Sequence, residues 1–292
     1  MKKTLSYKVL VYTVLSLLTV VFVYPFFNMI MLSLMSYQEL QLFPPHWIPE
    51  SPQWSNFKNI WSAFGYTESG ASYVPLFLKN TLFIMVMKTA GMILSCTLCA
   101  YGFAKIKFPG REIIFFGILA TMMIPGSVTM IPLFTLYKNF RWLDTLNPMW
   151  IPVWFGGGAM NIFLLRQFIK STIPDTLLES ARLDGAGHLR CYWDIVMPNL
   201  KPMIFMLVLE SVNSAWGDYF QPMIYINTKE KWTVALAVRN MVSSTDVAGG
   251  VGSGALNVQM ATCVIMSLVP LITFAAGQKN YVENVTLTGI KG

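Results

Sequence analysis

The sequence predicts an all-α, polytopic membrane protein with six transmembrane helices and a cytoplasmic helix-turn-helix loop. Of its 292 residues only 12% are charged and 54% are hydrophobic, and the mean hydropathy is +0.52. A soluble domain averages about a quarter charged residues. Six apolar segments are long enough to cross a bilayer, because a spanning helix needs about 20 apolar residues. We expect residues 1–292 to form a single transmembrane domain.

The first predicted span covers about residues 9–35 and follows three lysines among the first eight residues. Pro25 and Asn28 are its only interruptions. A secretory signal has an apolar core of only about 7–15 residues and a small-residue cleavage site, and this segment has neither feature. We therefore expect a helix that enters the membrane from the cytoplasm.

Residues 36–74 form a polar segment with four prolines and three tryptophans. That composition is typical of an ordered extracytoplasmic loop with interfacial aromatic side chains. The second span, about residues 76–104, contains the charged Lys88. The third span, about residues 113–136, holds Pro125-Gly126 and Pro132. A membrane helix tolerates such breaks where neighbours satisfy the freed carbonyls, and breaks of this kind often line a cavity.

The fourth span, about residues 148–168, contains Gly156-Gly157-Gly158-Ala159, and small residues of this kind permit close contact between helices. The fifth and sixth spans cover about residues 203–226 and 258–277. Between them, residues 227–257 are rich in Gly, Ser and Val and are predicted to be a flexible outer loop. The remaining residues form a cytoplasmic tail.

The orientation follows from the basic residues between the spans. With both termini in the cytoplasm, thirteen Lys and Arg residues lie on the inner side, seven lie on the outer side and Lys88 lies within a span. An inward excess is what the positive-inside rule requires. The net charge of +7 is thus explained by membrane topology and does not indicate a nucleic-acid partner. We expect a multi-pass protein of the cell membrane.

The sizeable polar passage between the fourth and fifth spans, residues 174–198, predicts two short helices. Pro174 suits a first helical turn, and Gly185 can take the left-handed conformation that ends a helix. After that glycine, an apolar stripe at helical spacing is formed by Ala186, Leu189, Trp193 and Val196. Pro198 is expected to end the second helix. An amphipathic loop lying on the membrane surface is an alternative interpretation.

This loop resembles the EAA motif of ABC-importer permeases, in which Glu-Ala-Ala, three residues, Gly, nine residues and Ile-x-Leu-Pro form coupling helices. Those helices dock into a cleft on the ATPase subunit. Five residues here stand at the spacings of the motif: Glu179, Ala181, Gly185, Ile195 and Pro198. Ser180 replaces an alanine and Met197 replaces the leucine. Both replacements are small or conserve volume, so the docking role that the resemblance implies is retained.

Other stretches resemble the carbohydrate branch of these permeases, and in particular the smaller of the two maltose-type permeases. They are AYGFAKIKFPGR at 100–111, MIPGSVTMIP at 123–132, FLLRQFIK at 163–170 and the closing TGIKG. The resemblance implies a second homologous permease, a pair of cytoplasmic ATPase subunits that hold ATP and Mg²⁺, and an extracytoplasmic solute-binding protein. It also implies that residues 281–292 reach the ATPases and that residues 243–256 approach the binding protein.

The resemblance and the charges together give the predicted ATPase-coupling residues. They are Glu179, Ser180, Ala181, Arg182, Asp184, Gly185, Ala186, Leu189, Ile195 and Pro198. Glu179 and Asp184 are expected to cap helices or to pair with the ATPase. Arg182, with Arg190, either makes charge contacts there or belongs to a solvated polar face. The small and apolar members are expected to pack at the interface.

Charged or polar groups inside a span are functional hypotheses, because burying them in lipid is costly. The substrate-pathway candidates are Lys88, Glu210, Asn213, Trp216, Asp218 and Tyr219. Aromatic faces beside hydrogen-bonding groups suit sugars, which offer hydroxyls and an apolar ring face. The alternatives are that Lys88 and Glu210 pair with each other or with the partner subunit, and that the others form an interfacial aromatic belt.

The chain has no G-x-x-x-x-G-K-[ST] motif, so it is not expected to hydrolyse ATP itself. No metal site is predicted, since its two histidines fall on opposite sides of the membrane and its four cysteines suggest no cage. We expect a permease subunit of an ATP-driven carbohydrate importer, without enzyme activity or a bound cofactor of its own. The alternatives are an ion-coupled secondary transporter, with Lys88 and Glu210 as relay groups, and an ABC permease for another solute.

Overall fold

The computed structural model describes residues 5–44, 46–248 and 256–289, with side chains for 7–44, 46–242 and 256–277. These residues are predominantly helical, and among them the only β-type pairing is an isolated bridge between Tyr66 and Ser72. They divide into a terminal unit, Met1–Pro75 with Ala237–Val269, and a central unit, Leu76–Leu236 with Pro270–Gly292. Each unit is described by itself, and the single-domain organisation stays a prediction.

The terminal unit contains α1 (Leu5–Leu34), α2 (Ser55–Ala63), most of α13 (Val234–Ala248) and the first part of α14 (Leu256–Gly289). Buried amide side chains join three of these helices. Asn56 Nδ2 donates to the carbonyl oxygens of Ser33 and Met35, both at 2.9 Å, and Asn257 Nδ2 donates to Met35 O and Asn56 Oδ1 at 3.2 Å. A buried amide must find such partners, so these bonds fix the helix ends.

The polar segment after α1 has a defined conformation, as predicted. The buried Glu39 carboxylate accepts hydrogen bonds from the backbone N–H of Ser36 at 2.7 Å and of Glu50 at 2.9 Å. These bonds, led by that from Ser36, lower the pKa of Glu39. The side chains of Trp47, Trp54 and Trp61 are exposed, as expected of aromatic residues at a membrane interface.

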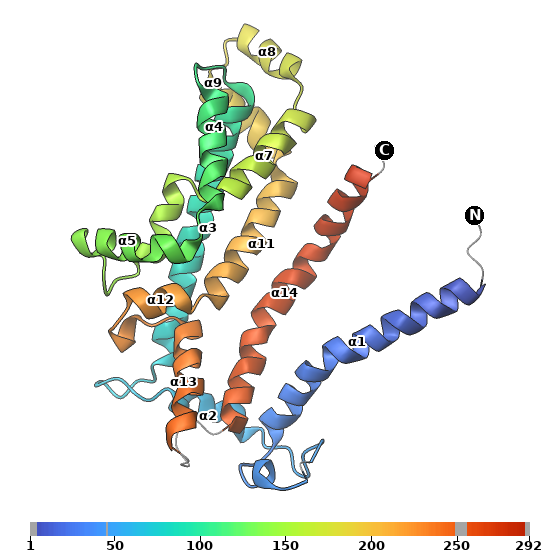
Figure 1. The fold of residues 1–292 in the computed structure, drawn as a ribbon, viewed down its shortest axis with the longest axis vertical. Helices are drawn as coiled ribbons and strands as arrows, with labels where there is room; N and C mark the ends of the chain where they lie inside the picture. The colour runs from blue at the N-terminus through green and yellow to red at the C-terminus, as the bar shows by residue number, and fades with distance from the viewer. Residues whose placement is uncertain (1–4, 45, 249–255, 290–292) are drawn as a thin grey trace. The chain divides into compact units, whose positions relative to one another are not determined.

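The central unit is a bundle in which α3, α4, α7 and α11 share one hydrophobic core (Figure 1). Its first helices are α3 (Val74–Lys105), α4 (Arg111–Ala120), α5 (Gly126–Asn139), α6 (Asn147–Trp150) and α7 (Ala159–Thr172). Then come α8 (Asp175–Leu183), α9 (His188–Cys191), α10 (Met197–Asn199), α11 (Lys201–Gly217) and α12 (Phe220–Tyr225). Helices α8 and α9 lie at one end of this bundle and α12 lies toward the other.

Four helical segments of the described chain are long and apolar enough to cross a membrane: Tyr7–Leu34, Val74–Lys105, Asn147–Thr172 and Leu256–Gly277. Two bent pairs bring the number to six if each pair is one span. They are Arg111–Met123 with Gly126–Asn139, bent by 101°, and His188–Asn199 with Lys201–Gly217, bent by 77°. The polytopic all-α prediction is confirmed, with a helix count consistent with six spans.

The bend in the third span lies at Pro125, as the sequence indicates. Ile124 leaves the helical region at ψ 116°, and Pro125 is extended at ψ 136°. A proline ring disfavours the helical conformation in the residue before it, which explains the break at Ile124. Helix α5 continues through Pro132, so only the first of the two proline sites breaks the span.

The prediction of the fifth span, residues 203–226, is wrong at its C-terminal end, because the helix ends earlier. Helix α11 stops at Gly217, and Asp218 is extended at ψ 107°. The Asp218 Oδ1 atom accepts the backbone N–H groups of Phe220 and Gln221, each at 3.1 Å, so it caps α12. Asp218, predicted to line the substrate pathway, thus caps α12 instead.

The prediction of a flexible loop over residues 227–257 is wrong for the middle part of this segment, which forms α13. Thr81 Oγ1 accepts the N–H of Val234 at 3.0 Å, and Thr233 Oγ1 accepts the N–H of Leu236 at 3.3 Å. These hydroxyls satisfy N–H groups that a helix start leaves unpaired. The glycine-rich run 249–255 lies outside the described residues. Composition alone therefore missed a capped helix.

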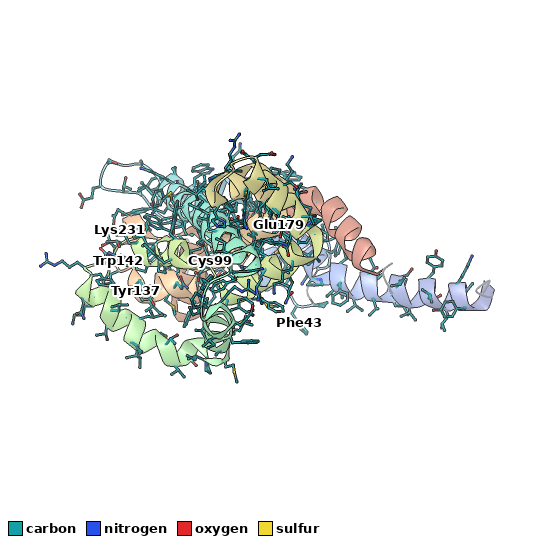
Figure 2. The ribbon with its side chains drawn as sticks, turned by 90° about the horizontal axis from the view of Figure 1, so that it is seen from above. Phe43, Cys99, Tyr137, Trp142, Glu179 and Lys231 are labelled. Carbon is teal, nitrogen blue, oxygen red and sulfur yellow. The ribbon has the colours of Figure 1, made fainter. Side chains whose placement is uncertain are left out.

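Asp144 joins two loops of the central unit. Its Oδ1 accepts the N–H of Asn227 at 3.0 Å and of Thr228 at 2.8 Å, and Lys231 Nζ donates to Oδ2 at 2.7 Å. Desolvation acts to raise the pKa of Asp144, but hydrogen bonds from Lys231 and Thr228 outweigh it and hold the pKa well below its usual range. Figure 2 shows Lys231 on the same side of the molecule as Tyr137 and Trp142, whose rings stack 5.6 Å apart.

The packing role predicted for the glycine run in the fourth span is confirmed at Gly157. A Cβ atom added there would lie 2.9 Å from Cys96 Sγ, 3.1 Å from Ser95 Oγ and 3.2 Å from Met92 Cα, all on α3. The Gly157 N–H donates to Ser95 Oγ at 3.1 Å. Only a hydrogen atom fits at this position.

The Gly157→Ala variant should lose about 1–3 kcal/mol of unfolding free energy, because the added methyl group overpacks the contact with α3. The control is Gly117→Ala in α4, where an added Cβ meets nothing within 4 Å. It should be neutral or stabilising, since alanine favours helix. Thermal unfolding of the detergent-purified protein measures both. Equal melting temperatures for the two variants would show that the contact is not tight.

Candidate functional site

The start of the coupling loop, Pro174–Pro198, is anchored by Lys105, the last residue of α3. Lys105 Nζ donates to the carbonyl oxygen of Ile173 and to Asp175 Oδ1, the latter at 2.7 Å, and its side chain is only 4% exposed. The hydrogen bond from Lys105 lowers the pKa of Asp175. Asp175 is the first residue of α8, where a carboxylate also complements the helix dipole. Lys105 therefore fixes the start of α8 to the end of α3.

The turn after α8 accounts for the small residues of the motif. Gly185 has φ +84°, its N–H donates to Arg182 O at 3.0 Å, and the Ala186 N–H donates to Ala181 O at 2.9 Å. These two bonds are the pair that defines a Schellman cap. Ala181 and Ala186 both pack against the core of the central unit. The motif thus specifies a capped end of α8, with the small residues Ala181 and Ala186 packed against the core.

The second part of the loop is anchored by its inner face. Cys191, Tyr192 and Val196 are fully buried. The Tyr192 hydroxyl is 2.7 Å from Thr97 Oγ1 on α3, and its ring lies 5.8 Å from that of Tyr101. A buried phenol needs a hydrogen-bond partner, so Thr97 fixes the orientation of this ring.

The predicted apolar stripe does not lie on one face, so this prediction is wrong. Residues Tyr192–Val196 form a π-helical turn. Pro198 lacks the N–H that an α-helix would direct at Asp194 O, and its ring would clash there, so a wider turn relieves the conflict. The wider turn rotates Val196 inward, while Leu189 and Trp193 stay outside. The helical run ends at Asn199, one residue beyond the predicted stop.

The outer face of the coupling loop exposes three large apolar side chains: Leu183 at 89%, Leu189 at 71% and Trp193 at 53%. They come from both helices of the loop. Leu189 and Trp193 are four positions apart in one helical run, and exposed apolar patches of this kind mark interaction sites. The loop thus has a buried face and a free face suited to a partner.

The other predicted coupling residues have varied positions. Ser180 Oγ donates to Thr176 O at 2.7 Å within α8, and the exposed Asp184 is the C-cap residue. Ile195 packs against the core, whereas Pro198 is exposed. Arg190 pairs with Asp194 at 3.3 Å on the surface. Ser180 and Ile195 therefore serve the loop itself rather than its free face.

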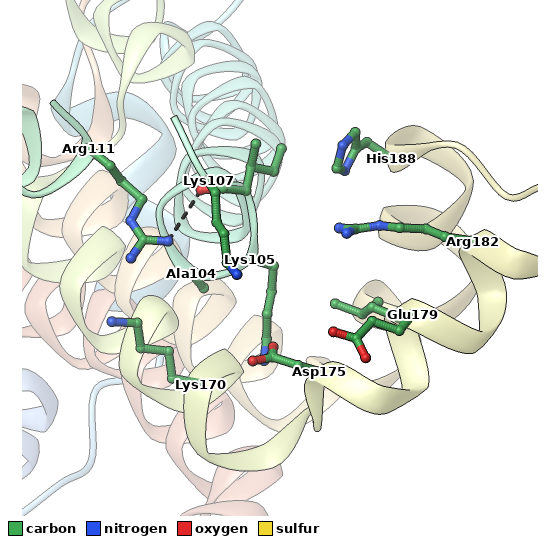
Figure 3. Close-up of a pocket in the computed structure, with 11 residues that line it drawn as sticks. Ala104, Lys105, Lys107, Arg111, Lys170, Asp175, Glu179, Arg182 and His188 are labelled. Carbon is green, nitrogen blue, oxygen red and sulfur yellow. Dashed lines mark hydrogen bonds and ion pairs between the residues drawn. The ribbon is translucent and has the colours of Figure 1, made fainter. Parts of the chain in front are cut away.

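Glu179 and Arg182 point into a cavity of about 580 Å³ beside the loop (Figure 3). Its other charged or titratable lining residues are Lys105, Lys107, Arg111, Lys170, Asp175 and His188. They come from the end of α3, the turn before α4, the end of α7 and the coupling loop. We call this space the basic cavity. The sequence places these lysines on the inner side of the membrane but does not predict a cavity between them.

A second cavity, of about 630 Å³, brings together two of the predicted pathway residues. Glu210 and Asn213 of α11 line it with Asn161 of α7 and mostly apolar neighbours. The buried Asn161 donates to Glu210 Oε1 at 3.4 Å, and Thr273 Oγ1 donates to Asn213 Oδ1 at 3.4 Å. We call this space the amide cavity. Asn161 was missed, although an asparagine within an apolar span is the signal that identified Asn213.

The remaining pathway candidates lie elsewhere. Trp216 is buried, Asp218 caps α12, and Tyr219 is exposed beside it. Lys88 is half-buried on α3, and among the described residues it forms no salt bridge with Glu210. Within the same part of the chain, no group of three His, Cys, Asp or Glu side chains could hold a metal ion.

Comparison with known families identifies the chain. Residues 93–285, which include the coupling loop and both cavities, match the model of the binding-protein-dependent transport system inner membrane component. The chain belongs to this family. It is therefore a subunit of an ABC importer and a transport component rather than an enzyme, and it is a multi-pass membrane protein. The general partners of such a subunit are another permease, ATPase subunits and a binding protein.

Individual relatives agree with this assignment. The chain is 32% identical over 237 residues, 80% of each protein, to the sn-glycerol-3-phosphate transport system permease protein UgpE of Yersinia enterocolitica. It is 27% identical over 275 residues, 94% of each, to UgpE of Escherichia coli O1:K1 / APEC. A bacterial ABC transporter involved in the import of the acidic polysaccharide alginate has the same fold, with a TM-score of 0.80 over 96% of this chain and 99% of that one, at 21% identity.

Replacing Gly185 by alanine should loosen the coupling loop, because an L-residue at φ +84° costs about 1–2 kcal/mol. Gly187→Ala is a matched control two residues away, where φ is −72° and the space is equally open. Hydrogen exchange of residues 180–190 measures both. Faster exchange is expected in Gly185→Ala alone, and identical exchange in the two variants would contradict the role of the cap.

Proposed function

We propose that this chain is a permease subunit of a carbohydrate importer and that its coupling loop docks on a cytoplasmic ATPase subunit. The observation that carries the proposal is the two-faced coupling loop. Its inner face is held by Lys105, Tyr192 and Val196, while Leu189 and Trp193 are left free. A loop fixed to the transmembrane helices on one side and to a moving ATPase on the other transmits motion between them.

The remaining partners follow the same proposal. A second homologous permease completes the translocation pathway, an extracytoplasmic binding protein delivers the solute, and ATP with Mg²⁺ is held by a pair of ATPase subunits. Both termini are cytoplasmic, in accord with the inward excess of basic residues. The exposed apolar side chains of α1 and α4 are suited to contact with lipid or with the second permease. The tail from residue 281, whose side chains lie outside the described residues, is proposed to reach the ATPases.

The amide cavity supports a hydroxyl-rich, uncharged solute. Asn161 and Asn213 offer amide donors and acceptors, Glu210 offers an acceptor, and no lysine or arginine is among the described side chains that line the space. Amides and carboxylates hydrogen-bond to hydroxyl groups, whereas a carboxylate repels a phosphate. Glycerol 3-phosphate, the solute in the names of two relatives, is therefore not the solute that we propose for this chain. Neutral sugars are the proposed class.

The assembled importer, reconstituted with its ATPases and binding protein, should show ATP hydrolysis that is stimulated by a neutral mono- or oligosaccharide. Glycerol 3-phosphate should have no effect. The measurement is the ATPase rate across a panel of both kinds of solute, with the binding protein omitted as the control. Stimulation by the phosphate ester and by no sugar would overturn the assignment of the solute. Transport without ATPase subunits would overturn the importer mechanism.

A further inference from the structure

The basic cavity has an excess of positive charge that no described carboxylate balances. Five cationic side chains line it, against the carboxylates of Asp175 and Glu179. Asp175 is already paired with Lys105, and Arg111 is paired with Glu112 at 3.0 Å. Within the described chain, three of the cations have no salt-bridge partner: Lys107, Lys170 and Arg182. These cations come from three separate elements and converge on one space (Figure 3).

Glu112 supplies only part of the missing negative charge near Lys170, because its main partner is a buried arginine. Arg166, which is 4% exposed, donates through Nη2 to both Glu112 oxygens, at 2.7 Å to Oε2, and its guanidinium lies 3.9 Å from the centre of the Phe115 ring. Both bonds come from the one nitrogen, and such charge-assisted hydrogen bonds are roughly twice as strong as neutral ones. The geometry of α4 and α7 thus directs Glu112 mainly at Arg166, and within the described chain Lys107 and Lys170 are left without a salt bridge.

The surroundings of the cavity indicate what kind of anion fits. A smaller cavity of about 380 Å³ shares Lys107 and Arg111 with the basic cavity. Its other lining residues are Phe108, Gly110, Ile113 and Glu112, whose carboxylate is paired with Arg166 and Arg111. Ile113 is 80% exposed at the start of α4, which belongs to a candidate membrane span. A cationic space thus opens beside apolar side chains at a helix end. That is the combination that an anionic headgroup with attached acyl chains requires.

We propose that the basic cavity binds the phosphate group of an anionic phospholipid, with Lys107 and Lys170 as its principal contacts. The acyl chains lie along Phe108 and Ile113. Basic pockets between transmembrane helices on the cytoplasmic side bind such headgroups. The occupied cavity joins the turn before α4, α7 and the coupling loop through one shared anion, so the lipid supports the loop. The cytoplasmic side is taken from the proposed function, whereas the chemistry of the cavity is independent of transport.

The test uses the assembled importer in detergent and native mass spectrometry. Phosphatidylglycerol is titrated into wild type and into the double variant Lys107→Gln/Lys170→Gln. Each basic residue near an anionic lipid contributes to its binding, and the loss of two of them should weaken the affinity of the variant for the lipid about 30-fold. The matched control is Lys58→Gln/Lys138→Gln, which removes the same charge from two exposed lysines outside the cavity and should bind as wild type does. All four side chains are exposed, so folding is expected to be unaffected.

Two further arms separate the sources of phosphate. Phosphatidylcholine should bind at least tenfold more weakly than phosphatidylglycerol, and inorganic phosphate up to millimolar concentrations should not displace the lipid. Displacement by inorganic phosphate, with the same dependence on Lys107 and Lys170, would make free phosphate the occupant and overturn the lipid. Equal binding by the two double variants would overturn the site. Loss of the ATPase subunits from Lys107→Gln/Lys170→Gln, with unchanged lipid binding, would make the cavity a protein contact instead. None of these results bears on the carbohydrate assignment.

Discussion

The anchoring of the coupling loop to the end of α3 is the constraint on which the rest of the account depends. Lys105 ties the start of α8 by its ion pair with Asp175, and Thr97 fixes the Tyr192 ring of the second helix. Both contacts bury groups that would be costly to leave unpaired. With those groups satisfied, the loop is fixed to α3, and this is the connection through which the proposed function transmits a displacement of the free face to the transmembrane helices.

The small residues of the loop serve this anchoring rather than the partner. Gly185 closes α8 with a left-handed residue, and the cap brings Ala181 and Ala186 onto the core. Larger side chains at the two alanines would hold the loop away from α3. The motif therefore combines residues that shape the loop, such as Gly185, with residues such as Leu189 that only its free face uses. Glu179 belongs to neither group, because it lines the basic cavity.

Much of this arrangement could be predicted from residues with one strong conformational preference. Gly185 ends a helix, Pro125 breaks a span, and Gly157 packs against α3, all as the sequence indicated. The predictions that were wrong concern features that depend on contacts between distant segments or on the number of residues in a helical turn. The π-helical turn before Pro198 changes which residues share a face, and a helical wheel with 3.6 residues per turn cannot anticipate it. The start of α13 is capped by Thr81, more than a hundred residues earlier in the chain, so local composition gave no sign of this helix.

The affinity of the ATPase subunit for the permease tests the central claim most directly. Leu189→Asn combined with Trp193→Asn removes apolar contact from the free face while leaving the buried anchors in place, so binding should weaken at least tenfold. Arg190→Ala lies between these positions, and its only described ion pair is with Asp194, so it should bind within about threefold of wild type. Unchanged ATPase affinity in the Leu189/Trp193 double variant would contradict the assignment of this face as the docking surface.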